Sequence, residues 1–370
     1  GGMVRVKSVL NMMMMSFGAL AIVFVLWIAF GFSMVFGESV GDLGLIGDIR
    51  QFTFLKGLDN PSAIIGTIPA AVFIAFQGIF AAITVALISG SIADRAKFGA
   101  WMVFAGIWAT LVYFPVAHWV FAFDDFVAKT GGWIANDLGA LDFAGGTAVH
   151  INAGAAGLAL AIILGKRVGF GRVPMRPHSL PLVMLGAALL WFGWFGFNAG
   201  SALGASGLAA TAMINTQVAT AGAAMSWLVY EKIKGGKATT LGVASGAVAG
   251  AVAITPACGY LNPMGALALG LIAGVVSAWA VTRKYKFGYD DSLDVVGVHG
   301  VGGILGMLAI GLMATVTANA AGANGLFTGG GATQLNRQLI AIVAVAIFSF
   351  VATWIIATII QKTIGFRAYR

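Results

Sequence analysis

The feature that most constrains this chain is a series of apolar segments, each long enough to cross a bilayer, that follow one another from end to end. About 20 apolar residues span the hydrocarbon core as a helix, which satisfies its own backbone hydrogen bonds. The segments fall at residues 10–36, 62–90, 99–121, 143–165, 180–199, 205–230, 239–257, 263–282, 293–316 and 336–361. Only 9% of the residues are charged, which excludes an ordinary soluble domain. We predict an all-α, polytopic membrane protein with ten visible transmembrane helices.

The basic residues predict how these helices are oriented. When the connecting regions are numbered alternately, all but four of the 21 Lys and Arg residues fall on one side, and the four exceptions are Arg50, Lys56, Lys129 and Arg337. Because Lys and Arg accumulate on the cytoplasmic side, both visible ends are predicted to be cytoplasmic. The net charge of +8 therefore reflects membrane topology, and no nucleic-acid partner is expected.

Two histidines, His150 and His299, lie inside apolar segments, where an ionisable side chain is costly and usually functional. Eight positions before them stand Asp142 and Asp291, each where an apolar helix begins. The topology sends the 143–165 helix inward and the 293–316 helix outward, so the histidines approach mid-membrane from opposite faces. This pattern predicts an inverted repeat, and transporters place their pathway at the interface of such repeats. Small residues that allow close helix packing follow both histidines, among them Gly154, Gly300 and Gly303.

A second group of residues predicts an entrance to such a pathway. The run W-F-G-W-F-G-F-N-A-G-S ends at Ser201, and the run F-Q-G-I-F contains Phe76, Gln77 and Phe80. Aromatic faces attract cations by about 0.5–2 kcal/mol, and a hydroxyl or amide oxygen accepts a hydrogen bond from a cation rich in N–H groups. Together these residues predict an aromatic-lined entrance above a histidine-lined channel.

Several long motifs carry a resemblance to a known family: D-F-A-G-G-T-A-V-H-I-N-A-G, G-K-R-V-G-F-G, G-W-F-G-F-N-A-G-S-A, T-P-A-C-G-Y and D-V-V-G-V-H-G-V-G-G-I-L-G. They resemble the ammonium transporter (Amt/Mep/Rh) family, on its ammonium-transporter branch, over nearly the whole chain and in the family's order. The resemblance implies a channel in the plasma membrane with no enzymatic activity, cofactor or metal, and a homotrimer with one pore per subunit. It also implies a cytoplasmic PII-type regulatory partner, bound through a C-terminal tail that mostly lies beyond Arg370.

The resemblance also implies how the chain is divided. Family members have eleven transmembrane helices, so the ten visible segments fit if the first helix is missing. Residues 1–370 then form one integral-membrane domain, in which an inverted five-helix repeat is followed by a final helix. Residues 1–165 are the end of the first half, residues 180–316 are the second half, and residues 336–361 are the final helix.

Carried over position by position, the resemblance assigns roles to individual side chains. His150 and His299 match the hydrogen-bonded twin histidines of the pore, and Phe80 and Phe197 match the stacked pair that closes the outer vestibule. Further matches are Ser201 to the hydroxyl ligand, Asp142 to the acid needed for recruitment or deprotonation, and Gln77 and Trp194 to nearby vestibule positions. At the mouth Phe121 stands where relatives generally carry a tryptophan, before an apparent insertion, F-D-D-F-V-A-K-T. Phenylalanine is a weaker cation–π partner, unless Trp133 folds back to replace it.

The implied mechanism begins with ammonium at the aromatic vestibule. Deprotonation then lets ammonia pass the histidines, while the proton is co-translocated or returned. Simpler structural roles stay open for the polar residues: Asp142 is a good helix N-cap, Asp291 and Asp294 fit caps or a cytoplasmic network, and Ser201 fits a turn. Two other functions also remain as alternatives. Paired histidines on transmembrane helices can ligate haem in an electron-transfer protein, and the chain can instead serve as an ammonium sensor.

Overall fold

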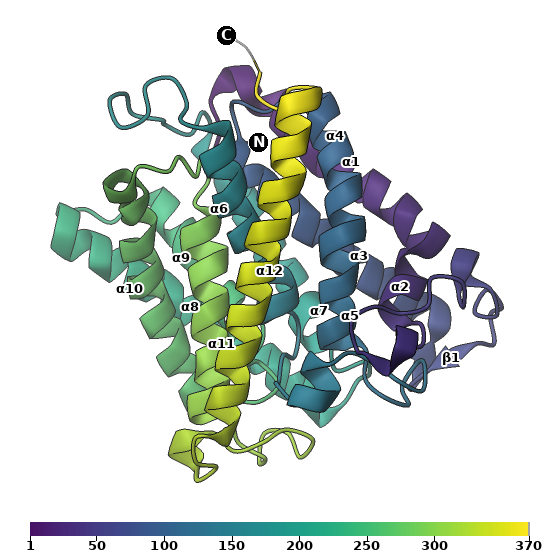
Figure 1. Ribbon diagram of the computed structural model, residues 1–370. Helices are drawn as coiled ribbons and strands as arrows, with labels where there is room; N and C mark the ends of the chain where they lie inside the picture. Colours follow the sequence, from purple (N-terminus) through teal and green to yellow (C-terminus); the bar gives the residue numbers. More distant parts are fainter. Residues whose placement is uncertain (369–370) are drawn as a thin grey trace.

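Long apolar helices make up most of the computed structural model, which describes residues 1–368 (Figure 1). The α-helices are α1 (Val9–Leu26), α2 (Phe32–Phe36), α3 (Ala70–Ile88), α4 (Phe98–Trp108), α5 (Phe114–Phe121), α6 (Asn152–Leu164), α7 (Leu180–Gly200), α8 (Gly207–Gly235), α9 (Thr240–Ile254), α10 (Pro263–Phe287), α11 (Val301–Met313) and α12 (Thr333–Thr363). Short 3-10 turns are η1 (Val6–Ser8), η3 (Val40–Asp42), η4 (Thr53–Leu55), η5 (Ser89–Ile92) and η10 (Leu326–Thr328). A two-stranded hairpin joins β1 (Ile64–Ile65) to β2 (Ile68–Pro69).

Within residues 1–368, eight helical stretches are long and apolar enough to cross a membrane. They are Val6–Phe36, Ala70–Ile92, Phe98–Phe121, Gly146–Leu164, Leu180–Ala202, Pro263–Phe287, Val296–Met313 and Thr333–Thr363. The two remaining predicted segments also coincide with helices, the shorter α9 and the more polar α8, which ends in basic residues. The chain is therefore a helical, multi-pass membrane protein.

Several helix boundaries differ by a few residues from the predicted segments, and local chemistry explains two of the differences. The 62–90 segment begins with the β1–β2 hairpin, which turns at Gly66 with a φ of +59°, and α3 starts only after Pro69. Proline lacks a backbone N–H but fits the start of a helix, so it marks the boundary. The 143–165 segment becomes helical at Gly146, because Asp142 holds the preceding residues in a capped turn.

Residues 1–368 contain five π-helical turns, four of which interrupt or start a helix, and they could not be recognised in the hydropathy pattern. They are η2 (Trp27–Gly31), η6 (Ala109–Tyr113), η7 (Ile134–Leu138), η8 (Gly146–Ile151) and η9 (Val296–Gly300). Such turns are rare and occur often at functional sites. Here η8 contains His150 and leads into α6, and η9 contains His299 and leads into α11.

The helices pack as a bundle, and among the membrane-length stretches within residues 1–368 the one that contains α6, Gly146–Leu164, is the most buried. In Figure 1, α12 (yellow) crosses the front, with α8, α9 and α10 on one side and α1, α3 and α4 on the other. Hydrogen bonds from buried indole N–H groups connect segments that lie far apart in the sequence. Trp27 donates to the Ile74 carbonyl, and Trp101 donates to the Met15 carbonyl. Trp108 donates to the Thr353 hydroxyl. These bonds satisfy the polar end of each large apolar ring.

The beginning and the end of the described chain lie at the same end of the bundle, called here the terminal end (Figure 1). Both contact the loop before α4: Arg5 pairs with Asp94, and the Ala368 amide donates to the Arg95 carbonyl. An even number of crossings between them accounts for this arrangement.

A buried ion-pair network joins separate loops at the terminal end. Arg167 donates to Asp290 at 2.8 Å and to Asp94 at 3.4 Å, and Arg95 donates to the Ser292 hydroxyl at 2.7 Å. Burial opposes ionisation of Asp290, but the hydrogen bonds and charge of Arg167 outweigh it and hold the pKa of Asp290 below its ordinary value. Burial lowers the pKa of Arg95 to about 10. The charges are thus paired where three loops meet.

Candidate functional site

The structure brings His150 and His299 into direct contact. Their Nδ1 atoms are 3.1 Å apart, and their rings lie 5.3 Å apart with an interplanar angle of 20°. Both side chains are buried, and Nε2 of His150 has no hydrogen-bond partner in residues 1–368. The pair therefore presents imidazole nitrogens inside an otherwise apolar bundle.

Glycines allow the two histidine-bearing helices to meet. A Cβ added to Gly154 would lie 2.4 Å from the Cα of Gly300, and one added to Gly303 would lie 2.8 Å from the Gly146 carbonyl oxygen. No residue with a side chain fits at so close a backbone approach. The small residues that follow each histidine in the sequence thus set the distance between the two rings.

Trp194 of α7 lies against the first histidine. Its ring is 5.8 Å from that of His150 at an interplanar angle of 15°, and its indole N–H donates to the Thr255 hydroxyl at 2.8 Å. Phe197, one turn further along α7, contacts both Trp194 at 5.7 Å and His150 at 6.2 Å. A continuous set of rings therefore leads from Phe197 to the histidines.

Phe80 of α3 and Phe197 of α7 form the next layer. Their rings are stacked 4.2 Å apart at 16°, and Phe121 meets the edge of Phe80 at 6.0 Å. The Ser201 hydroxyl donates to the Phe197 carbonyl at 2.8 Å, which leaves its oxygen lone pairs free to accept. A cavity of about 410 Å³ adjoins the stacked pair, with Phe76 and Gly200 among its lining residues.

Within residues 1–368, neither Gln77 nor Trp133 makes a hydrogen bond or ring contact to this layer. Gln77 is half-buried on α3, and its side chain makes no hydrogen bond to any residue between 1 and 368. The ring contact recorded for Trp133 is with Trp119, at 5.9 Å, and the indole N–H of Trp119 donates to the Leu45 carbonyl. Phe121 therefore remains the aromatic residue beside Phe80 at this position.

Asp142 caps the π-helical turn that carries His150. Its two carboxylate oxygens accept four hydrogen bonds from the chain just ahead, from the amides of Gly145, Gly146 and Thr147 and from the Thr147 hydroxyl, at 2.6–2.8 Å. Burial raises the pKa of the Asp142 carboxyl, although these bonds oppose the change. Its negative charge faces the positive end of the helix. Asp142 thus serves as a helix cap, whichever further role it has.

Asp291 and Asp294 occupy the corresponding place before His299. Asp291 accepts from the Val296 amide at 2.7 Å, and Lys284 donates to Asp294 at 2.5 Å and to the Asp291 carbonyl at 2.9 Å. Burial, followed by the neighbouring charge of Asp294, raises the pKa of Asp291 to about 6. Asp291 therefore caps the turn that carries His299, and Asp294 forms a local charge network with Lys284. Both are structural roles that the sequence left open for these residues.

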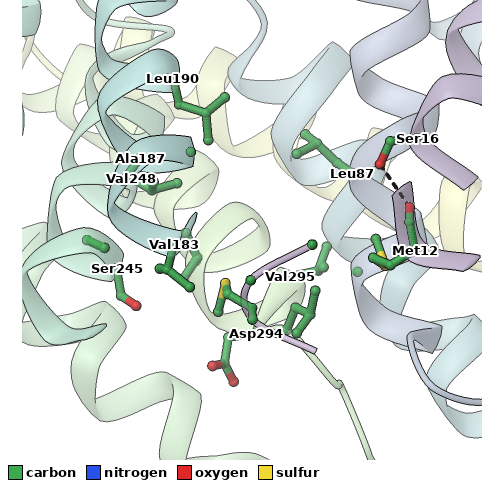
Figure 2. Close-up of a pocket in the computed structure, with 18 of the residues that line it drawn as sticks. Met12, Ser16, Leu87, Val183, Ala187, Leu190, Ser245, Val248, Asp294 and Val295 are labelled. Atoms are coloured by element: carbon green, nitrogen blue, oxygen red, sulfur yellow. Dashed lines mark hydrogen bonds between the residues drawn. The ribbon is translucent and has the colours of Figure 1, made fainter. Parts of the chain in front are cut away.

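A second cavity, of about 380 Å³, leads from the terminal end to His299. Figure 2 shows Val183, Val248, Ser245 and Asp294 around it, with carbon atoms forming most of the lining. His299 lines this second cavity, and Phe197, which contacts His150, lines the first.

The contact between the histidines is unfavourable for haem. An iron atom between two imidazole nitrogens needs them roughly 4 Å apart, twice a metal–nitrogen bond of about 2 Å. The Nδ1 atoms of His150 and His299 are closer than that, and the rings are stacked on each other. The geometry does not favour the electron-transfer alternative.

Thr255 is the residue of this site that sequence reasoning missed. It lies in the motif T-P-A-C-G-Y, which was noted only for its resemblance. A buried tryptophan needs a hydrogen-bond acceptor for its N–H, and this was the available signal. The pattern did not show which hydroxyl would provide it, since Trp194 and Thr255 lie 61 positions apart.

Comparisons with known proteins show which family the chain is similar to. The model of the Ammonium Transporter Family matches residues 1–370. An ammonium transporter of Mycobacterium bovis is 57% identical, over 99% of this chain and 81% of its own, and one of Bacillus subtilis is 46% identical, over 100% and 88%. The crystal structure of Saccharomyces cerevisiae Mep2 aligns with a TM-score of 0.87 at 34% identity, covering 100% of this chain and 84% of that one.

Proposed function

The chain belongs to the Ammonium Transporter Family, and we propose that it carries its substrate as neutral ammonia past the contact between His150 and His299. Ammonium transport itself follows from the family and from the named relatives. The proposal concerns the route and the form in which the substrate crosses the membrane. The observation that carries it is the buried contact between His150 and His299, with His299 at the end of one largely apolar cavity and Phe197, which touches His150, beside another.

The free-energy cost of moving a charge into an apolar passage supports the passage of neutral ammonia in place of ammonium. A bare cation in an apolar passage loses its hydration, and an isolated buried charge is far costlier than a neutral polar group. Ammonia carries no charge, and it can exchange hydrogen bonds with the imidazole nitrogens. Potassium has no proton to release, so the same passage excludes it.

Recruitment is assigned to the layer around Phe80 and Phe197. Their rings and that of Phe121 attract a cation, and the free lone pairs of Ser201 accept a hydrogen bond from it. We assign Asp142 an indirect part: its oxygens are occupied by four bonds from its own chain, so it acts through its field and by holding the His150 turn. Gln77 and Trp194 complete the proposed set, Gln77 near the entrance and Trp194 beside His150.

We propose the membrane location, the orientation and the partners of the protein from the family resemblance and the charge pattern. We place the terminal end in the cytoplasm, because the basic residues gather there, and the protein in the plasma membrane. A homotrimer with one pore per subunit, and a cytoplasmic PII-type partner, are part of the same proposal. On this topology Phe80 and Phe197 close the pore from outside, and Asp294 lies at its cytoplasmic mouth.

The test compares the reconstituted wild-type protein with the double variant His150→Ala, His299→Ala. Ammonium and potassium fluxes are measured in proteoliposomes, together with the current that follows an ammonium pulse at several pH values. We expect the double variant to lose selective ammonium flux. A transient current in the wild type would mean that the proton crosses as well, whereas flux without current would mean that it stays outside.

His178→Ala is the matched control, because His178 lies in the loop before α7 and bonds only to the Val4 carbonyl. This variant should transport normally. Undiminished, potassium-excluding flux through the double variant would contradict the proposed route.

A further inference from the structure

We propose that Thr255 is a positioning residue for transport: its hydroxyl anchors Trp194, and Trp194 fixes the plane of the His150 ring. This inference rests on the proposed function of His150. It assigns no substrate contact to Thr255. The residue acts through two contacts in series, a hydrogen bond to the indole and a stack of the indole on the imidazole.

The hydrogen bonds of Thr255 define its orientation. Its hydroxyl donates to the Ala251 carbonyl at 2.7 Å, so the lone pairs of its oxygen are left to accept from the Trp194 indole N–H at 2.8 Å. Thr255 is fully buried and Trp194 is 7% exposed, so no solvent is available to replace either partner. A donor–acceptor chain of this kind allows one rotamer of the hydroxyl and one placement of the indole.

His150 has few hydrogen bonds of its own to fix the plane of its ring. Its Nδ1 bonds to His299, but its Nε2 has no partner among residues 1–368. The torsion that turns an imidazole about its Cβ–Cγ bond is intrinsically broad, so a single hydrogen bond does not by itself fix the tilt of the ring. The indole of Trp194, lying at 15° to the imidazole, removes that freedom.

The position of Thr255 in the fold is rigid. It follows the last residue of α9, and the neighbouring backbone is pressed against both histidine-bearing segments. A Cβ added to Gly146 would lie 2.5 Å from Pro256, and one added to Gly306 would lie 2.0 Å from the Ala253 carbonyl oxygen. The anchor is therefore fixed to the same frame that holds η8 and α11.

The direct test is Thr255→Val, which keeps the shape of the side chain and removes the acceptor. The buried indole N–H is left unpaired, so Trp194 shifts and His150 loses its support. We expect saturating ammonium flux in proteoliposomes to fall about tenfold, as expected for a misplaced functional group. The half-saturating concentration should stay unchanged, because Phe80, Phe197 and Ser201 are untouched. Thr255→Ser restores the hydroxyl and should restore the flux.

A matched control is a second tryptophan, Trp191, on α7, the helix that carries Trp194. The indole N–H of Trp191 donates to the exposed Gln217 side chain at 3.0 Å, away from the histidines. Gln217→Met removes that acceptor without removing bulk, and we expect no change in flux. Equal slowing by Gln217→Met and Thr255→Val would contradict a specific role for Thr255.

A double-variant comparison separates positioning from general loosening of the bundle. If Thr255 acts through His150, then Thr255→Val adds no further slowing in a His150→Ala background. Additive effects would overturn the inference while leaving the proposed function intact. Unimpaired flux in His150→Ala itself would instead overturn the proposed function. Should Thr255→Val not fold, Trp194→Phe keeps a ring in place, removes the donor and is expected to behave in the same way.

Discussion

Gly154 on α6 and Gly300 at the end of η9 are in such close backbone contact that a Cβ on Gly154 would lie 2.4 Å from the Gly300 Cα. This contact sits four residues after His150 and one after His299, so it sets how closely the two rings approach. The close packing of the two histidine-bearing segments thus depends on the absence of a side chain at Gly154.

Gly154→Ala should therefore impair both stability and transport. The added methyl group forces the helices apart, and overpacking of this kind costs about 1–3 kcal/mol. We expect a lower melting temperature in detergent and a reduced ammonium flux in proteoliposomes. Gly99→Ala is the control, since Gly99 is an exposed helical glycine with open space around it. A Gly154→Ala protein with full flux would show that the histidine distance is not critical.

Phe197→Ala should weaken substrate recruitment. The substitution removes one of two rings stacked 4.2 Å apart, and a cation–π contribution of about 0.5–2 kcal/mol corresponds to a rise of about twofold to thirtyfold in half-saturating ammonium. The flux measured against ammonium concentration provides the readout. Phe192→Ala, at a position on the same helix with a 77% exposed ring, should leave the curve unchanged. An unaltered curve for Phe197→Ala would remove this ring from the recruitment site.

Asp291→Asn should stabilise the protein in a pH-dependent manner. Burial and Asp294 raise the pKa of Asp291 from 3.8 to about 6, so the folded protein binds this proton more tightly than the unfolded chain. Wild-type stability therefore falls as the pH rises from about 4 to 6, and the loss persists above pH 6. Lys284 and Asp294 are the charged neighbours, and the amide oxygen of asparagine still caps the Val296 amide.

The measurement is the melting temperature of both proteins between pH 4 and pH 8. The advantage of Asp291→Asn should grow up to pH 6 and then remain constant. Asp59→Asn alters an exposed carboxyl in the loop before β1 and should produce no such trend. A difference that shrinks with rising pH would contradict the assigned direction.

Arg167→Met should destabilise the terminal end. It leaves Asp290 buried without its main partner, and breaking a buried ion pair in this way costs about 3–5 kcal/mol. Because the pKa of Asp290 is lowered, the stabilisation is present above the ordinary carboxyl pKa and disappears as the pH falls through the lower folded value. Melting temperatures should thus differ most at neutral pH. Adding Asp290→Asn to Arg167→Met should recover part of the loss.

Most of the transmembrane helices could be predicted from the sequence, because a chain segment that crosses a bilayer must be long, apolar and hydrogen-bonded to itself. Each of the ten predicted segments coincides with helical structure, since a long apolar run has no other way to satisfy its backbone in lipid. Boundaries depended on local chemistry instead. Pro69 delays α3, and the hydrogen bonds of Asp142 delay the helix that carries His150, and neither effect alters hydropathy.

The site was readable in part. The sequence pattern paired His150 with His299, and the structure places them in contact. The π-helical turns that carry these two histidines could not be predicted from the spacing of the residues. The hydrogen bond between Trp194 and Thr255 could not be predicted from the sequence for another reason. A hydrogen bond between distant segments depends on how α7 and α9 pack, and helix periodicity carries no information on that.

The hydrogen bond between the two Nδ1 atoms has a consequence for the identity of each ring. One bond needs one hydrogen, so when both imidazoles are neutral one carries it on Nδ1 and the other on Nε2. The two side chains, each carried by a π-helical turn that leads into a helix, are therefore different tautomers whenever both are neutral. A molecule passing them meets a bare nitrogen on one ring and an N–H on the other, and exchanging these roles requires a proton to move on both rings. The pair thus has two neutral states, which differ in the ring that donates the shared hydrogen.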